Sequence, residues 1–238
     1  MSIPLRCSSI FPPLLLPDLC IVKKEKKMST ETKYNSIKRS DYARYIQEGI
    51  DYSQYKIQMA EDLALNADVK IKEYINLNQR RMYRVEKTYN VSGELAAQVK
   101  NLKHKTYWLV LTEHWCGDAS QILPALNKVA ELSEGKIEMK LVYRDQNAAL
   151  MDAYLTDGRR SIPKLVQLDE HFNVTGIWGP RPSVAQKLVK QLKSNPATAS
   201  TYANELHLWY AKDKQQSLEK EIAQLIFRAN LFCPDCLS

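Results

Sequence analysis

The stretch of this chain best suited to chemistry is Tyr107–Ser120, which reads Y-W-L-V-L-T-E-H-W-C-G-D-A-S. Its apolar and β-branched first half, Tyr107–Thr112, has the composition of a strand buried on both faces. A helical pattern begins at Gln121, so a strand runs directly into a helix with Cys116 at the junction. The unpaired N–H groups at a helix start favour an anion, and the thiolate is the nucleophilic form of cysteine. Cys116 is therefore the predicted nucleophile.

A buried free cysteine more often acts as a small hydrophobic side chain, and this alternative applies to Cys116 as well. The junction between strand and helix, the preceding Trp115 and the following Gly117 favour the reactive thiol. The sequence leaves its acidity open. The helix start and a charge on His114 would lower the pKa of the thiol, whereas the Asp118 carboxylate would raise it.

The residues around the cysteine carry a resemblance to a known family. The stretch W-C-G-D-A, residues 115–119, resembles the W-C-G-P-C active-site motif of the thioredoxin family, with Ala119 in place of the second cysteine. Pro124 stands eight residues after Cys116, where members of that family carry the proline that kinks the active-site helix.

Two later stretches match the same family in the same order. Residues 142–147 (V-Y-R-D-Q-N) resemble the end of its next strand, and residues 158–165 (G-R-R-S-I-P-K-L) resemble its G-x-R-G-I-P-T-L loop. In the family the proline of that loop, here Pro163, is cis and packs beside the reactive cysteine. The resemblance covers about residues 105–192.

The resemblance implies an α/β fold of the thioredoxin type, a mixed central sheet with flanking helices. We place this core at residues 105–194. Apolar residues at helical spacing predict an N-terminal helical extension of about three helices in residues 41–104. Residues 195–238 are expected to form a C-terminal helical extension that ends in a C-x-x-C tail.

Periodicity and turn residues also predict the individual elements. The expected strands are 107–112, 137–143, 164–168 and 174–178, the last two joined as a hairpin. The expected helices are 93–102 with Ser92 as N-cap, 121–133, 147–156, 183–192, 202–210 and 217–227.

Residues 1–40 are expected to form a disordered leader. Pro12, Pro13 and Pro17 interrupt the apolar part, and no small-residue cleavage site follows, which makes it a poor signal peptide. The run K-K-E-K-K before Met28 could be a translated ribosome-binding site, so Met28 is a candidate true start and residues 1–27 a candidate annotation artefact. A disordered basic leader is the alternative.

The composition narrows the class of protein. Hydrophobic content of 45% and charged content of 26% are typical of a globular domain, and no apolar run approaches the roughly 20 residues of a membrane span. The modest net charge of +7 does not indicate nucleic acid binding. Five cysteines suit a reducing compartment, and the resemblance to bacterial thioredoxin-family proteins implies a cytoplasmic setting. We expect no cofactor, no metal and no membrane.

The motif departs from the family in ways that limit its chemistry. Ala119 cannot resolve a mixed disulfide, and Val110 occupies the position of the family's buried carboxylate. Cys116 can still attack a disulfide, because that step needs only one thiolate. The prediction is a monothiol thiol-disulfide oxidoreductase acting on a protein or low-molecular-weight disulfide.

The remaining site residues follow from the resemblance. Trp115 would assist Cys116 as an apolar wall. The expected substrate contacts are Gly117, Asp118, Ile162, Pro163 and Arg160. Arg160 would favour the thiolate or receive an anionic substrate, and an exposed loop arginine with neither role is the alternative.

Cys233 and Cys236 form a C-x-x-C pair near the C-terminus. Either thiol could act as the missing resolving group for Cys116. The pair could also be half of a zinc site, although no second half stands out, or an inert reduced tail.

Two other classes of function stay open. A non-catalytic thioredoxin-like module would use the cis-proline groove to hold a protein partner, and a thiol pKa near 8.5 or above would favour it. A monothiol glutaredoxin relative is the third reading, but such proteins have Ser where Ala119 stands. The basic run of Arg80, Arg81, Arg84 and Lys87 indicates either a solvated helix face or a grip on an acidic partner.

Overall fold

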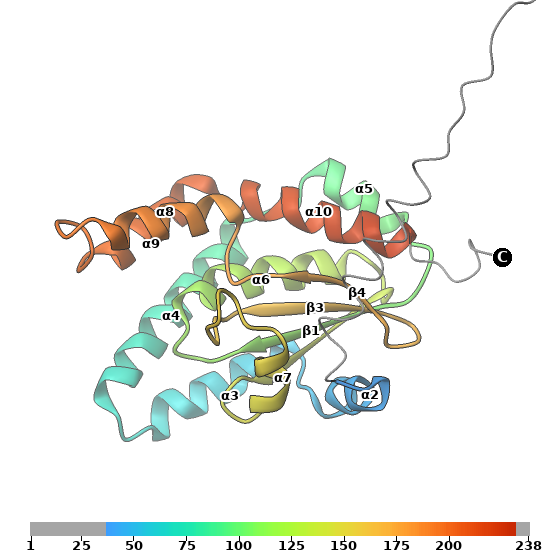
Figure 1. The fold of residues 1–238 in the computed structure, drawn as a ribbon, viewed down its shortest axis with the longest axis horizontal. Coiled ribbons are helices and arrows are strands. Elements are labelled where there is room, and N and C mark those ends of the chain that lie inside the picture. Colours follow the sequence, from blue (N-terminus) through green and yellow to red (C-terminus); the bar gives the residue numbers. More distant parts are fainter. Residues whose placement is uncertain (1–36, 232–238) are drawn as a thin grey trace, which may run out of the picture. The chain divides into compact units, whose positions relative to one another are not determined.

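A four-stranded mixed sheet lies at the centre of residues 37–231, the part of the chain that this computed structural model describes (Figure 1). Its strands are β1 (Thr106–Thr112), β2 (Ile137–Tyr143), β3 (Lys164–Asp169) and β4 (Val174–Trp178). The strand order is β2-β1-β3-β4, with β1 parallel to β2 and antiparallel to β3, and β3 antiparallel to β4. The thioredoxin-like α/β fold predicted from the sequence is therefore confirmed.

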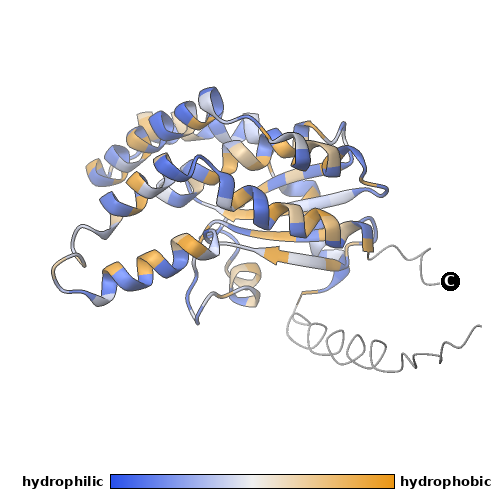
Figure 2. Cartoon of the chain, turned by 90° about the horizontal axis from the view of Figure 1, so that it is seen from above, coloured by the Kyte–Doolittle hydropathy of each residue, from blue (hydrophilic) through white to orange (hydrophobic). Residues whose placement is uncertain are grey.

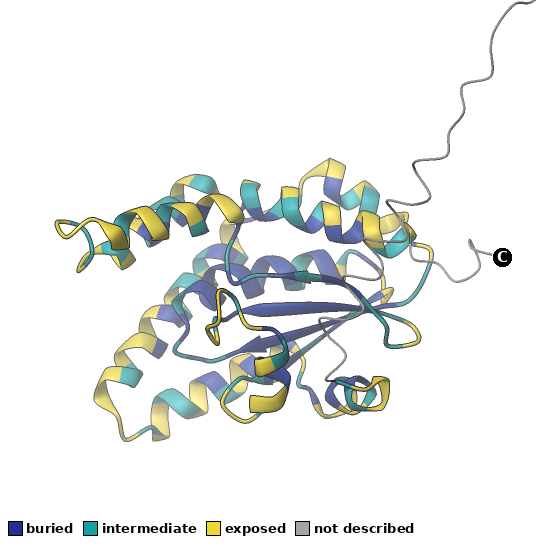
Figure 3. Ribbon diagram, viewed as in Figure 1, coloured by how far each residue is buried: buried dark blue, intermediate teal, exposed yellow. Residues whose placement is uncertain are grey.

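The central strand β1 is the most deeply buried element of the sheet. Residues 108–111 have no exposed surface, as the apolar run of the sequence predicts for a strand covered on both faces. The indole of this strand is satisfied internally, because Trp108 Nε1 donates a hydrogen bond to Gln167 Oε1 at 3.1 Å. Figure 3 shows the sheet as the dark, buried layer between helices whose outer faces are exposed.

Helices cover both faces of the sheet (Figure 1). On one side lie α6 (Gly117–Glu131) and α10 (Gln216–Leu231), and on the other lie α2 (Arg39–Glu48), α3 (Tyr52–Leu65) and α7 (Ala148–Ala153). In Figure 2 apolar and polar residues alternate along the helices, which gives these helices an apolar face. The helices bury these faces against the strands, which is the arrangement that stabilises a two-sided sheet.

The N-terminal extension holds four helices among the described residues, where the sequence indicated about three. Gly49 ends α2, and Asp51 begins α3 as its N-cap by accepting a hydrogen bond from Gln54 N at 2.8 Å. A Cβ at Gly49 would lie 2.8 Å from Tyr45 O, so the chain approaches too closely there for a larger residue. This break divides what periodicity alone presents as one helix.

Two further helices complete that extension. The long α4 (Val69–Thr88) packs along α6, and α5 (Gly93–Lys100) follows it. Ser92 is the N-cap of α5, as predicted, and its hydroxyl accepts a hydrogen bond from Leu95 N. These contacts place α4 beside the start of α6, where Cys116 lies.

The last three helices of the described residues are α8 (Ser183–Ser194), α9 (Tyr202–Asp213) and α10. At the start of α10, Gln215 Nε2 donates to Gln121 O at 2.9 Å, and near its end Asn230 Oδ1 accepts from Lys103 N at 3.2 Å. The helix therefore runs from the active-site end of the sheet to the opposite end. Within residues 37–231 no helix has the length and apolarity to cross a bilayer.

Candidate active site

Cys116 is the N-cap of α6, at the C-terminal end of β1. Its Sγ accepts a hydrogen bond from Ala119 N at 3.5 Å and donates one to Ile162 O at 3.4 Å. The Ile162–Pro163 peptide bond is cis. Local sequence thus brings the thiol to the helix start, and the tertiary fold brings the loop before β3 against it.

The thiol is buried, with the whole residue only 6% exposed. Burial, followed by the neighbouring Asp118 carboxylate, raises the pKa of Cys116 to about 12. The backbone N–H groups of Ala119 and Asp118 and the charge of Arg181 act in the opposite direction but are weaker. In this arrangement Cys116 is a neutral thiol, because desolvation outweighs the helix start.

Asp118, in the first turn of α6, holds the centre of a buried ionic cluster. Arg181 donates through Nε to Asp118 Oδ1 at 2.9 Å, and its Nη2 lies 2.7 Å from Oδ2. Tyr210 OH on α9 donates to the same Oδ1 at 2.8 Å. Burial raises the pKa of the Asp118 carboxyl, while Arg181 and Tyr210 oppose that shift. The cluster ties the segment after β4 and the C-terminal extension to the cysteine motif.

Two side chains from the extensions cover Gly117. A Cβ at this position would lie 2.9 Å from His207 Nε2 on α9 and 3.3 Å from Arg81 Nη1 on α4. Burial and the charges of Arg81, Arg84 and Arg181 lower the pKa of His207 to about 4. His207 is therefore neutral at physiological pH. We call α9 with His207 and Tyr210 the cap, because it closes this side of the thiol.

The second wall of the site is a pair of proline loops. Gly179, at φ +107°, lies so close to Pro163 O that a Cβ could not be accommodated, and its bond to Pro180 is also cis. Lys164 is buried directly after Pro163, and its Nζ donates to Gly179 O at 3.1 Å. Burial lowers the pKa of Lys164 to about 8. The loop after β4 is thus fixed to the loop before β3, which aims Arg181 at Asp118.

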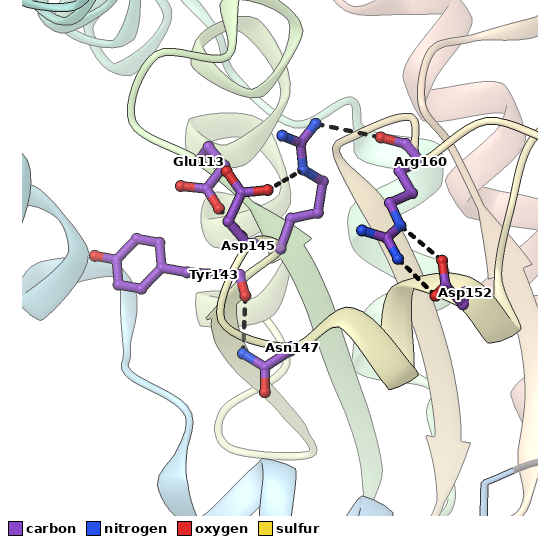
Figure 4. A network of polar contacts seen from close by, with 7 residues as sticks. Glu113, Tyr143, Asp145, Asn147, Asp152 and Arg160 are labelled. Atoms are coloured by element: carbon purple, nitrogen blue, oxygen red, sulfur yellow. Dashed lines mark hydrogen bonds and ion pairs between the residues drawn. The ribbon is translucent and has the colours of Figure 1, made fainter.

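Trp115 is half-buried on the other side of the cysteine, and the Arg144 guanidinium lies 4.8 Å from its ring centroid. Arg144 also donates to Asp145 Oδ1 at 2.8 Å and to Arg160 O at 3.4 Å. Glu113 Oε1 accepts from Asp145 N at 2.8 Å, which closes the network drawn in Figure 4. These contacts fix the position of Trp115 relative to the loop that contains Pro163.

The structure directs Arg160 away from the thiol. Its Nε and Nη2 donate to Asp152 at 2.7 and 2.6 Å, and both side chains are about half exposed (Figure 4). The expected contact of Arg160 with Cys116 is not made in this arrangement, since its donors are turned toward α7. Arg181, which lies between two prolines, takes the position beside the cysteine motif instead.

His114 likewise faces other partners. Its Nδ1 lies 2.9 Å from Asp62 Oδ2 on α3, and its Nε2 lies 2.9 Å from Tyr143 OH on β2. Burial lowers the pKa of His114, although Asp62 opposes the shift. A neutral His114 imidazole does not supply the positive charge that was expected to lower the pKa of Cys116.

Of the predicted substrate contacts, the structure brings Gly117, Asp118, Ile162 and Pro163 around Cys116; the last three are buried and Gly117 is half-buried. Sequence reasoning missed that Arg181 and Tyr210 bind Asp118 and that His207 lies over Gly117. Arg81 was noted only as part of a basic run. Within that run Arg81 and Arg84 are half-buried, whereas Arg80 and Lys87 are exposed.

The predicted Cys233–Cys236 pair lies outside the described residues. Between residues 37 and 231, no group of three or more His, Cys, Asp or Glu side chains is arranged to hold a metal ion. The candidate site in this part of the chain therefore consists of one thiol, the proline loop that faces it, and the ionic cluster of Asp118.

A thiol at the start of a helix, facing a cis-proline loop at the end of a mixed sheet, defines a thioredoxin-like site. The sequence profile of the family described as Thioredoxin matches residues 64–193. Thioredoxin 1 of Nostoc sp. is 32% identical over 80 residues, which cover 33% of this chain and 72% of the relative. The chain belongs to the thioredoxin family.

Solved structures agree on the fold. A protein of unknown function from Pseudomonas aeruginosa superimposes with a TM-score of 0.55 at 20% identity, covering 79% of this chain and 98% of that one. An HIV epitope-scaffold gives a TM-score of 0.51 at 19% identity, covering 78% of this chain and 96% of that one. At these identities the two matches show a shared fold alone.

Proposed function

We propose that this protein performs thiol-disulfide exchange as a monothiol oxidoreductase, with Cys116 as its nucleophile. The observation that carries the proposal is the placement of Cys116 Sγ at the start of α6, 3.4 Å from the carbonyl that precedes cis-Pro163. An extended disulfide-bearing chain that pairs with the backbone of Ile162 would meet the sulfur there. Membership of the thioredoxin family supports the same class of reaction.

The reaction needs two balanced steps. The Cys116 thiolate attacks one sulfur of the substrate disulfide, forms a mixed disulfide, and releases the other substrate sulfur as a thiolate that takes up a proton. A second thiol then attacks the substrate sulfur of the mixed disulfide and regenerates Cys116. Ala119 cannot supply that thiol, so it comes either from a low-molecular-weight thiol or from the C-terminal cysteines.

Cys233 and Cys236, which lie outside the described residues, are the candidates for that second thiol within the same molecule.

The buried thiol sets a condition on the reaction. With its pKa raised to about 12, Cys116 is almost entirely protonated at pH 7. Exchange is therefore slow while the cap is closed. It becomes fast when a substrate displaces His207 and Tyr210 from the cysteine motif and lets water reach the sulfur. We also propose that the protein is cytoplasmic and that residues 105–194 form its thioredoxin-like core.

The second candidate is a non-catalytic module that holds a protein partner against the proline loop. The raised pKa of Cys116 favours it, since a permanently neutral thiol is not a nucleophile. Alkylation of Cys116 over a range of pH, with and without a disulfide-bearing peptide, separates the two candidates.

A turnover assay tests the assignment directly. Reduction of a small disulfide with excess thiol should be lost in Cys116→Ser and kept when Cys233 and Cys236 are both changed to Ser. Full turnover by Cys116→Ser would show that the nucleophile lies elsewhere.

A further inference from the structure

Two half-buried guanidinium groups on α4 have no role in the proposed exchange. Arg81 Nη1 donates to Asn78 Oδ1 at 2.9 Å, and Arg84 Nη2 donates to Gln121 Oε1 at 2.7 Å. Among residues 37–231, no carboxylate lies within 4.0 Å of either group. Charges removed from water are normally paired with an opposite charge, so this part of α4 carries positive charge without a direct ion pair.

The carboxylates nearest in the fold are already engaged. Asp118 binds Arg181 and Tyr210, while Glu86 accepts from Lys56 and Tyr52. Glu219 accepts from Tyr89 OH at 2.7 Å and from Ser92 N at 2.9 Å. None of these acids forms an ion pair with Arg81 or Arg84, although the charge of Asp118 acts on Arg81 from a greater distance.

A cavity of about 300 Å³ opens beside Arg84. It lies between the last turns of α4 and the turn that joins α9 to α10, and its polar wall is formed by Arg84, Thr88, Tyr210, Lys214 and Gln215. Lys214 is exposed and has no carboxylate within 4.0 Å among the described residues. We call this space the α4–α10 cavity. Two cations therefore line it without a counter-charge.

The backbone of the cavity wall is unusual. Lys214 and Gln215 have φ values of 51° and 71°, a left-handed conformation that glycine or asparagine adopts at lower cost. Gln215 is buried and fixed by the hydrogen bond from its Nε2 to Gln121 O. Such conformations persist where the surrounding structure holds them, and they cluster at binding sites. Here the turn presents a lysine side chain to the cavity.

We propose that the α4–α10 cavity binds an oxyanion, the phosphate or carboxylate group of a small ligand, through Arg84 and Lys214. Both side chains would donate charge-assisted hydrogen bonds, which are about twice as strong as neutral ones. The volume accommodates one such group with a short substituent. The site is independent of whether Cys116 reacts.

Binding of an anion in the cavity would change the electrostatic environment of the candidate active site. Arg84 bonds to Gln121, whose Nε2 lies 3.3 Å from His207 Nδ1, and His207 covers Gly117. The charges of Arg81 and Arg84 help to lower the pKa of His207. An anion at Arg84 offsets that effect, so the pKa of His207 should rise when the site is occupied. This gives a spectroscopic readout that does not depend on turnover.

The test is a titration of the full chain with inorganic phosphate and, separately, with acetate, against chloride at equal ionic strength. Calorimetry measures affinity, and the His207 ring protons in NMR spectra report occupancy. Arg84→Gln and Lys214→Gln should each weaken binding about tenfold. The matched controls are Arg80→Gln on α4 and Lys212→Gln near the end of α9, which remove the same charge from exposed positions.

The expected result is saturable binding of phosphate, acetate or both, lost in the two cavity variants and retained in the two controls. Which anion binds more tightly distinguishes a phosphate ligand from a carboxylate ligand. The proposal is overturned if neither anion binds beyond chloride, or if the controls weaken binding as much as the cavity variants. Lys214 is exposed, so its variant tests the proposal even if Arg84→Gln does not fold.

Discussion

Tyr210 donates a hydrogen bond of 2.8 Å to Asp118, 92 residues earlier in the chain. This contact joins the last part of the protein to the motif that holds the thiol. Asp118 occupies the position at which the W-C-G-P-C motif has proline. Its carboxylate binds Tyr210 of the C-terminal extension and Arg181.

The first prediction concerns the charge of Asp118. Asp118→Asn removes a negative charge beside Cys116 and leaves Arg181 free to stabilise the thiolate, so the pKa of Cys116 should fall. Alkylation of Cys116 by iodoacetamide at pH 8 should become at least about tenfold faster. Asp152→Asn, which removes an exposed carboxylate from Arg160, should leave the rate unchanged.

The second prediction concerns the hydroxyl of Tyr210. Tyr210→Phe takes one donor from a buried carboxylate and should lower the free energy of unfolding by about 2 kcal/mol. Urea denaturation measures this loss. Tyr74→Phe removes a hydroxyl from a side chain that is 46% exposed and should cost almost nothing. Equal stabilities of the two variants would mean that Tyr210 does not hold the cap.

The third prediction concerns the space above Gly117. Gly117→Ala introduces a Cβ 2.9 Å from His207 Nε2, so the cap must shift and stability should fall by about 1–2 kcal/mol. Cys116 should also become more accessible to alkylation. Gly93→Ala is the matched control, because its Cβ meets nothing within 4 Å at the first residue of α5. We expect it to be neutral or slightly stabilising.

The fourth prediction concerns His207 and pH. Its pKa is about 4 in the folded protein and near 6.5 in the unfolded chain, so only the unfolded state gains a proton between these values. Stability from the neutral imidazole is complete above about pH 6.5 and is lost as the pH falls toward 4. Urea denaturation should show a shallower loss in His207→Gln. If His207→Gln had the same pH dependence of stability as the unsubstituted protein, His207 would be exposed to solvent in the folded state and its pKa would not be lowered.

Local sequence signals predicted the core of this protein well. The apolar runs at 107–112 and 137–143 became β1 and β2, and the segments around Asp169 formed the expected hairpin of β3 and β4. The helix expected at 147–156 is shorter, ending at Ala153. Beyond it Asp157 and Gly158 take positive φ and Thr156 pairs with Arg159, which is turn geometry that periodicity does not reveal.

The side chains that pack over the candidate active site could not be predicted from local sequence. Arg181 and Tyr210 stand 63 and 92 residues after Asp118, and nothing in their local sequence marks them as its partners. The burial that raises the pKa of Cys116 likewise depends on tertiary packing, which the motif alone does not specify. Periodicity finds which faces of helices are apolar, but it does not find which polar residues meet across them.

Mass spectrometry of the disulfide trapped on Cys116 tests the central proposal most directly. The chain should be prepared with its other four cysteines changed to Ser, with and without the Asp118→Asn substitution, and both proteins mixed briefly with a small disulfide at pH 8. We predict one mixed disulfide at Cys116 in both, formed at least about tenfold faster in the protein that carries Asp118→Asn. Absence of any adduct in both proteins, under conditions where iodoacetamide labels Cys116, would contradict the redox function and leave the binding module.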